Sequence, residues 1–170
     1  MAWPVSTRAT DDLITAAIWN ADIAGNMNLL PHLLARKAAD ESVTSSTVLQ
    51  SDDELVTPSI GANEVWSLYV MLRFQSGVGD LKYSWQFPAS GNMLMTTVSS
   101  SGLSAAELTA SDTPTHALVG TATPRLYRLE AQFTNAGTPG VVTFRWAQSA
   151  SNGTATIVKA NSSLWGVKLG

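Results

Sequence analysis

The sequence contains no cysteine and few charged residues. The absence of cysteine excludes a disulfide framework, a thiolate metal site and a cysteine nucleophile. Only 14% of the residues are charged, where about 25% is typical of soluble domains, and the formal net charge is −3. A sparsely charged surface fits a protein whose faces are covered by neighbours, and it fits equally a small β-domain with a Ser/Thr-rich surface. Without excess positive charge, binding to nucleic acid is not expected.

The chain also lacks targeting and membrane signals. No basic segment followed by an apolar run opens the sequence, so no secretory signal is expected. No run approaches the roughly 20 apolar residues that a membrane-spanning helix needs, so no membrane partner is expected. These features predict a protein made in the cytoplasm of its host without a signal peptide.

The first forty residues predict a short helical arm. Apolar residues recur there at intervals of three to five, which fits one face of a helix. They are Ile14, Ile18, Ile23, Met27, Leu30 and Leu34. Pro31 predicts a break near Leu30, and a helix this short needs a surface to pack on, either its own domain or another subunit. Trp3 and Trp19 add aromatic area that is costly to leave in water. We therefore divide the chain into an N-terminal arm, residues 1–40, and a β-domain, residues 41–170.

From residue 41 onward the pattern alternates with a period of two, as strands with one buried face require. It is clearest in residues 64–75, 81–87, 125–134 and 142–146. Weaker candidates are residues 43–50, 92–99, 116–121, 154–159 and 163–169. About nine short strands with no helical pattern between them predict an antiparallel β-sandwich, for which a jelly-roll arrangement is the commonest at this strand count. Residues 103–108, in the connection from Ser99 to Thr115, are read as one helical turn.

No residues form a recognisable catalytic or metal-binding pattern. The two histidines, His32 and His116, are far apart in sequence. Serine is so abundant that a Ser-His-Asp combination found in the sequence would not indicate a catalytic triad. The acidic run from Asp52 to Glu54 would suit a hard cation only if its side chains converged, but adjacent strand residues point to opposite faces. We expect no enzyme activity, catalytic residue, metal or cofactor.

A glycan-binding module remains an alternative. It would need surface aromatic side chains with amides and carboxylates nearby. Trp66, Trp85, Trp146 and Trp165 lie on the apolar phase of the predicted strands and are therefore assigned to the core. A host surface glycan stays a possible partner, and a hydrolase in the same sandwich is a third class that the residues do not favour.

Two stretches of the sequence resemble small structural proteins of tailed bacteriophages. Residues 7 to 26, TRATDDLITAAIWNADIAGN, are similar to a segment near the N-terminus of such proteins, and residues 79–88, GDLKYSWQFP, with residues 146–148 and 163–169, are similar to their β-rich body.

The resemblance implies a non-enzymatic, trimeric virion component in the tail tip, in the tail fibres or on the capsid surface, where it would act as a decoration (cement) protein. Its partners would be itself, as a homotrimer, and other virion proteins. An assembly interface is expected on the arm, and its candidate residues are Trp3, Ile18, Trp19, Ile23, Met27 and Leu30.

Overall fold

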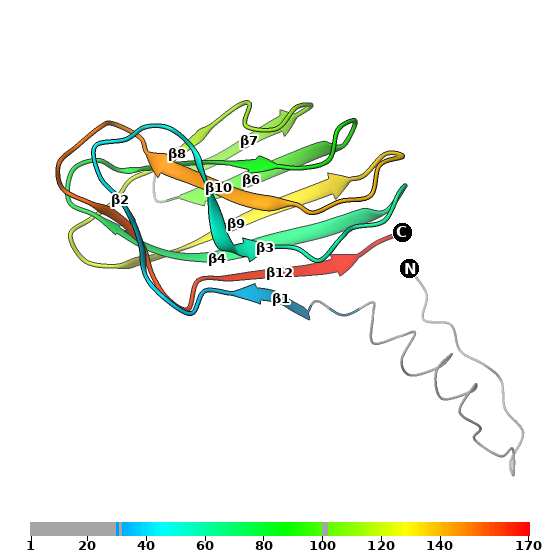
Figure 1. Ribbon diagram of the computed structural model, residues 1–170, viewed down its shortest axis with the longest axis horizontal. Helices are drawn as coiled ribbons and strands as arrows, with labels where there is room; N and C mark the ends of the chain where they lie inside the picture. The colour runs from blue at the N-terminus through cyan, green and yellow to red at the C-terminus, as the bar shows by residue number, and fades with distance from the viewer. Residues whose placement is uncertain (1–29, 31, 100–101) are drawn as a thin grey trace, which may run out of the picture.

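The computed structural model describes residues 30, 32–99 and 102–170, and within these ranges it is built of strands and connections. The strands form two antiparallel sheets (Figure 1). Among the described residues there is no helix long and apolar enough to span a membrane. The expected β-sandwich is confirmed, and residues 1–29 of the expected helical arm lie outside the described residues.

The larger sheet has eight strands. Six of them follow the order β1-β12-β4-β9-β6-β7, and β2 and β11 extend it beside β4. Their bounds are β1 His32–Arg36, β2 Glu41–Val43, β4 Val65–Ser76, β6 Asn92–Ser99, β7 Gly102–Leu108, β9 Arg125–Thr134, β11 Thr156–Val158 and β12 Ser163–Lys168.

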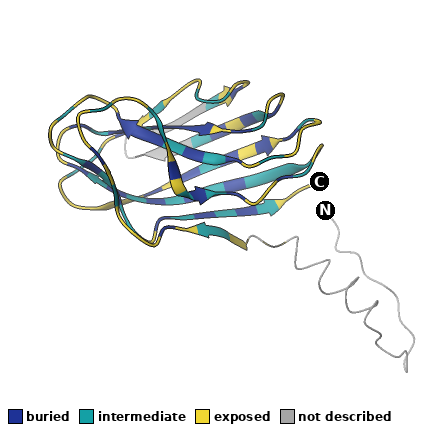
Figure 2. Ribbon diagram, in the orientation of Figure 1, coloured by how far each residue is buried: buried dark blue, intermediate teal, exposed yellow. Residues whose placement is uncertain are grey.

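The smaller sheet has the order β3-β10-β5-β8. Its strands are β3 Gln50–Val56, β5 Leu81–Gln86, β8 His116–Leu118 and β10 Thr143–Gln148. The facing sides of the two sheets share one hydrophobic core, and Trp85 and Trp146 are among its largest fully buried side chains. Figure 2 shows buried and more exposed residues alternating along the strands, as the period-two pattern predicts.

β4 is the central example of this alternation. Leu68, Val70, Leu72 and Phe74 are fully buried, whereas the residues between them are half-buried. Because β4 pairs along ten residues with β9 and also with β12 and β11, its backbone is bonded on both sides. Its even positions therefore fix which face of the larger sheet points to the core.

Three features differ from the sequence-based expectation. The candidate strand at residues 43–50 is not formed, because β2 ends at Val43 and β3 begins at Gln50. Residues 102–108 form β7, which pairs with β6 over its whole length, and not a helical turn. Residues 32–36 form β1, which pairs with the C-terminal strand β12, although the pattern places them in the arm. Leu34, assigned to the apolar stripe of the arm, packs against the core of the sandwich.

Candidate functional site on the outer face of the larger sheet

The residues proposed for the assembly interface fall almost entirely outside the described part of the chain. Trp3, Ile18, Trp19, Ile23 and Met27 all belong to residues 1–29. Leu30 is described, and its side chain is exposed just before β1.

The two histidines occupy different sheets. His32 begins β1, and its ring meets the ring of Trp66 edge-on with centroids 6.3 Å apart. His116 lies in β8 with its ring 5.8 Å from that of Tyr83, and burial lowers the pKa of its imidazole. Each ring packs against a different aromatic partner, so the fold does not combine them in one site.

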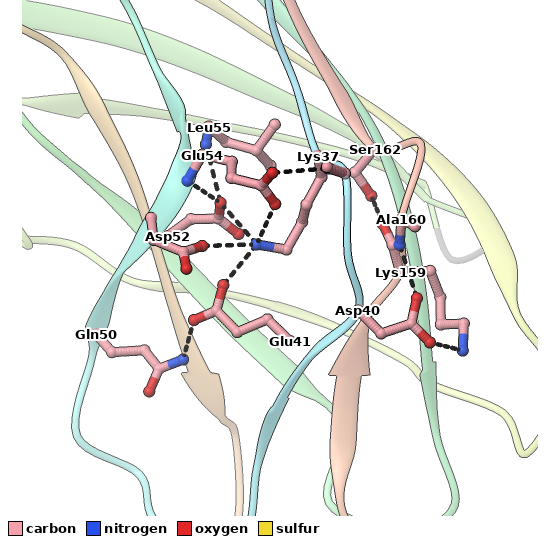
Figure 3. A network of polar contacts seen from close by, with 12 residues as sticks. Lys37, Asp40, Glu41, Gln50, Asp52, Glu54, Leu55, Lys159, Ala160 and Ser162 are labelled. Carbon is pink, nitrogen blue, oxygen red and sulfur yellow. Dashed lines mark hydrogen bonds and ion pairs between the residues drawn. The ribbon is translucent and has the colours of Figure 1, made fainter.

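The acidic run does converge, around a buried lysine. Lys37 follows β1, and its Nζ lies 2.6 Å from Glu41, 3.0 Å from both Asp52 and Asp53, and 3.6 Å from Glu54 (Figure 3). The side chains of Lys37 and Asp52 are almost completely buried. We call these five residues the Lys37 cluster.

A break in the ladder of β3 brings successive carboxylates together. The pairing of β3 with β10 shifts between Ser51, opposite Arg145, and Val56, opposite Thr143. Within this irregular stretch, Oδ1 of Asp52 accepts hydrogen bonds from the backbone N–H groups of Glu54 (3.0 Å) and Leu55 (2.9 Å). The period-two rule does not hold across such a bulge, which explains why the carboxylates do not point to opposite faces.

The charges of the Lys37 cluster depend on one another. Burial lowers the pKa of Lys37, but hydrogen bonds to Glu41 and Asp52 and the charge of Asp52 more than offset it, so the pKa lies above its ordinary value. Burial raises the pKa of Glu41, while the hydrogen bond to Lys37 keeps the pKa of Asp53 low.

The cluster is better explained as an internal ion network than as a metal site. Oxygen atoms of Glu41, Asp52 and Asp53 lie within 4.8 Å of one another, a spacing that a cation could bridge. The ammonium group of Lys37 already contacts all three carboxylates. Because Lys37 comes from the segment after β1 and Asp52 from β3, the network ties the edge of the larger sheet to the smaller one.

The outer faces of the two sheets differ sharply in polarity. On the smaller sheet the paired outward positions carry one apolar side chain larger than alanine, the half-buried Val56 opposite Thr143; the others are Ser51, Lys82, Ser84, Gln86, Ala117, Thr143, Arg145 and Ala147. On the larger sheet four leucines are conspicuously exposed: Leu33 (45%), Leu94 (50%), Leu126 (58%) and Leu169 (36%). We call this side of the larger sheet the outer face.

Half-buried aromatic rings cross the outer face in register. Leu33 of β1 pairs with Trp165 of β12, and Trp165 pairs with Tyr69 of β4. The rings of Tyr69 and Trp165 are parallel within 2°, with centroids 6.3 Å apart. Arg128 of β9 lies 5.3 Å from the centroid of the Tyr69 ring, and it forms an ion pair with Glu130 at 2.8 Å. Parallel rings at this spacing and a cation over a ring both stabilise such a row.

A shallow hollow of about 260 Å³ lies beside these rings. Leu94 and Leu169 contribute its apolar walls, and Ser67, Thr96, Glu130 and Gln132 contribute polar groups, together with Ala131. The outer face thus combines exposed leucines, aromatic rings and hydrogen-bonding groups on one surface.

The structure corrects the assignment of one tryptophan. Trp85 and Trp146 are buried in the core as expected, and the half-buried Trp66 packs against it, but Trp165 lies half-buried on the other face of the larger sheet. In β12 the inward positions are Leu164 and Gly166, so Trp165 between them faces outward. The sequence hides this because both sides of the strand carry apolar residues: Leu164 lies on one side, and Trp165 and Val167 lie on the other.

No protein-family model matches the sequence, and no curated protein matches it. Among solved structures, the chain is similar to a structure of the Gx strain of infectious bursal disease virus, with 14% identity, a TM-score of 0.21 and coverage of 82% of this chain and 41% of that chain. It is also similar to the VP2 subviral particle of infectious bursal disease virus, with 12% identity, a TM-score of 0.23 and coverage of 82% and 40%. The chain spans about two fifths of these proteins, and TM-scores this low carry no argument about function.

Proposed function

We propose that this chain is a non-enzymatic structural protein of a bacteriophage particle, which joins neighbouring subunits through its N-terminal arm and the outer face. The observation that carries the proposal is the contrast between the two outer faces. Within the described residues, the larger sheet is the one whose outer side exposes leucines and aromatic rings, and a gathering of apolar side chains on one face is typical of a protein–protein contact.

The distribution of ionisable groups supports a structural role. The densest group of carboxylates in the described residues is held by Lys37, and the two histidines contact different aromatic rings in different sheets. A catalytic site needs acids, bases or nucleophiles that converge on one open position. These groups instead serve to hold the sandwich together.

A homotrimer is the assembly we propose, in keeping with the resemblance of the sequence to tailed-phage structural proteins. The arm and the outer face are different surfaces, and a contact between different surfaces of identical subunits closes into a ring when the rotation allows it. This architecture suits two places in the particle. The chain would be an appendage on the tail or a decoration protein on the capsid surface.

Two measurements test the proposal. Light scattering after gel filtration of the full chain should give three times the chain mass of 18.0 kDa. Immunogold labelling of phage particles with antibodies against the chain should mark either the tail or the head. A chain that stays monomeric at high concentration and labels neither place would refute the proposal.

A glycan-binding module is the second candidate, and the hollow is the observation that favours it. Tyr69 and Trp165 are half-exposed, and the carboxylate of Glu130 and the amide of Gln132 lie next to them. Against this, Trp165 and Arg128 both pack on Tyr69, so little of that ring is left for a sugar to stack on. Binding of the full chain to a glycan array, lost in Gln132→Ala, would favour the glycan-binding role over the assembly role.

A further inference from the structure

The outer face lies between two edge strands that run in opposite directions. In the part of the chain that the structure describes, β1 pairs with β12 alone and β7 with β6 alone. Each of the five pairings along the path from β1 through β12, β4, β9 and β6 to β7 is antiparallel, so β1 and β7 are antiparallel to each other. An edge strand presents a row of backbone N–H and C=O groups that pair readily with a strand of another chain.

A threefold axis parallel to the strands would bring these two edges together in a favourable direction. Rotation about such an axis leaves the direction of every strand unchanged. β7 of one copy therefore lies antiparallel to β1 of the next copy, as an antiparallel ladder requires. Because β1 and β7 are different surfaces, the same contact repeats around the axis and closes a ring.

The dimensions of the outer face suit three copies around this axis. With neighbouring strands about 4.8 Å apart, the sheet from β1 to β7 is roughly 24 Å wide. Three sheets of this width form a triangle whose sides lie about 7 Å from its centre, and long side chains fill such a space, since each of two packed sheets lies about 5 Å from their midplane. β4 and β9 pair over ten residues, so at about 3.4 Å per residue the face covers roughly 800 Å². A stable interface covers about 800 Å² on each partner.

The side chains in the middle of the outer face suit a position near the axis. β4 and β9 are the two central strands of the six-strand path, and Tyr69 of β4 pairs with Glu130 of β9. Glu130 and Arg128 form an ion pair, and both side chains are about half exposed. Each copy thus brings one positive and one negative charge to the centre of the face, so three copies gather no net charge there.

We propose that three copies of the chain meet with their outer faces toward a common threefold axis, and that β1 of each copy lies beside β7 of the next. The exposed Leu33 on β1 and the exposed Leu94 on β6, the strand next to β7, then lie on the two sides of each junction and shield each other from water. The inference rests on the homotrimer of the proposed function, and it specifies which surfaces of two copies meet.

Cross-linking between introduced cysteines tests the junction, because the chain has no cysteine of its own. Leu33 on β1 and Glu107 on β7 are both exposed and lie at opposite edges of the sheet, roughly 24 Å apart. A short bis-maleimide cannot span this distance within one chain. The full-length variant Leu33→Cys/Glu107→Cys should therefore give linked dimers and trimers.

Two controls accompany this variant. Leu33→Cys/Lys82→Cys should give no linked product, because Lys82 lies on the outer side of the smaller sheet. Each single-cysteine variant should also give none, because the proposed contact joins two unlike edges.

A pair of charge variants tests the position of the axis. Arg128→Glu leaves only negative charge at the centre of the three faces, and the mass measured by light scattering should fall from three times the chain mass toward 18.0 kDa. Arg128→Glu/Glu130→Arg restores the balance of charge and should restore the trimer. Lys82→Glu makes the same change in net charge away from the axis and should leave the mass unchanged. Circular dichroism would show that the strands remain folded in each variant.

The possible outcomes separate this inference from the proposed function. A trimer that gives no link between positions 33 and 107 and keeps its mass in Arg128→Glu overturns the inference and leaves the assembly role intact. Linked dimers from Leu33→Cys alone would show that two like edges meet, which also overturns it. A monomer of the unchanged chain overturns the inference as well, and particle labelling then decides the structural role by itself.

Discussion

Replacing Lys37 by methionine should destabilise the protein far more than the loss of an ordinary surface charge. Methionine keeps most of the aliphatic stem of Lys37 but removes the ammonium group that contacts Glu41, Asp52 and Asp53. The Asp52 side chain, which has no solvent exposure, would remain as a buried charge without its counter-ion. Breaking a buried ion pair in this way costs about 3–5 kcal/mol, a large part of the 5–15 kcal/mol that typically stabilises a domain.

Urea unfolding followed by tryptophan fluorescence would measure this cost. With a slope of about 2 kcal/mol per molar urea, the midpoint should fall by roughly 2 M. The matched control is Lys159→Met, which breaks the partly exposed ion pair with Asp40 and should lower the urea midpoint far less. Adding Asp52→Asn to Lys37→Met should recover about 1 kcal/mol or more, because it removes the unpaired charge. Equal losses in Lys37→Met and Lys159→Met would refute this account of the Lys37 cluster.

Two further predictions concern other parts of the sandwich. Hydrogen bonds from Lys168, Trp66 and Gly61 lower the pKa of Glu64 from its ordinary value to about 2, so its stabilising contribution is present above pH 4.5 and is lost as the pH falls toward 2. Glu64→Gln should therefore flatten the dependence of unfolding free energy on pH in urea titrations between pH 5 and 2.5, and an unchanged slope would contradict this assignment. Gly120→Ala should cost about 1–3 kcal/mol in urea unfolding, because the added Cβ would lie 2.5 Å from Cβ of Ser76. A Cβ at Gly137 meets no atom within 4 Å, so a loss as large in the Gly137→Ala control would mean that crowding is not the cause.

The strands with regular alternation could be predicted closely from the sequence. β6 and β9 occupy the expected residues 92–99 and 125–134, and β5 ends one residue before the expected limit. In these segments the apolar residues occupy one phase and the polar residues the other. A strand buried on one face must show this pattern, so it can be read without knowing the partner strand.

Other strands were missed because their local preference points elsewhere. Residues 103–108 contain alanine, leucine and glutamate, which favour helices, but pairing with β6 makes them a strand. β3 carries the acidic run, whose local sequence pattern does not predict a strand. Its carboxylates are paired with the ammonium group of Lys37, which lies fifteen residues before Asp52 in the sequence. In both segments, contacts with a partner distant in the sequence outweigh the local secondary-structure propensity of the residues.

The candidate site depended still more on tertiary structure. The sequence analysis assigned Trp165 to the core, and this was wrong because both sides of β12 carry apolar side chains. The pairing of Trp165 with Tyr69 and Leu33 places it on the outer face. The exposed leucines at positions 33, 94, 126 and 169 are far apart in the chain and become one surface only through the strand order of the larger sheet.

By itself, the sequence determined the class of structure: alternating apolar residues require strands with one buried face, and the absence of cysteine leaves the hydrophobic core to stabilise them. The tertiary structure decided which strands became neighbours, which face stayed exposed and which charges met around Lys37. The physical reason is that alternation is a local property of the backbone, whereas strand order, burial and ion pairing depend on contacts between residues far apart in the chain.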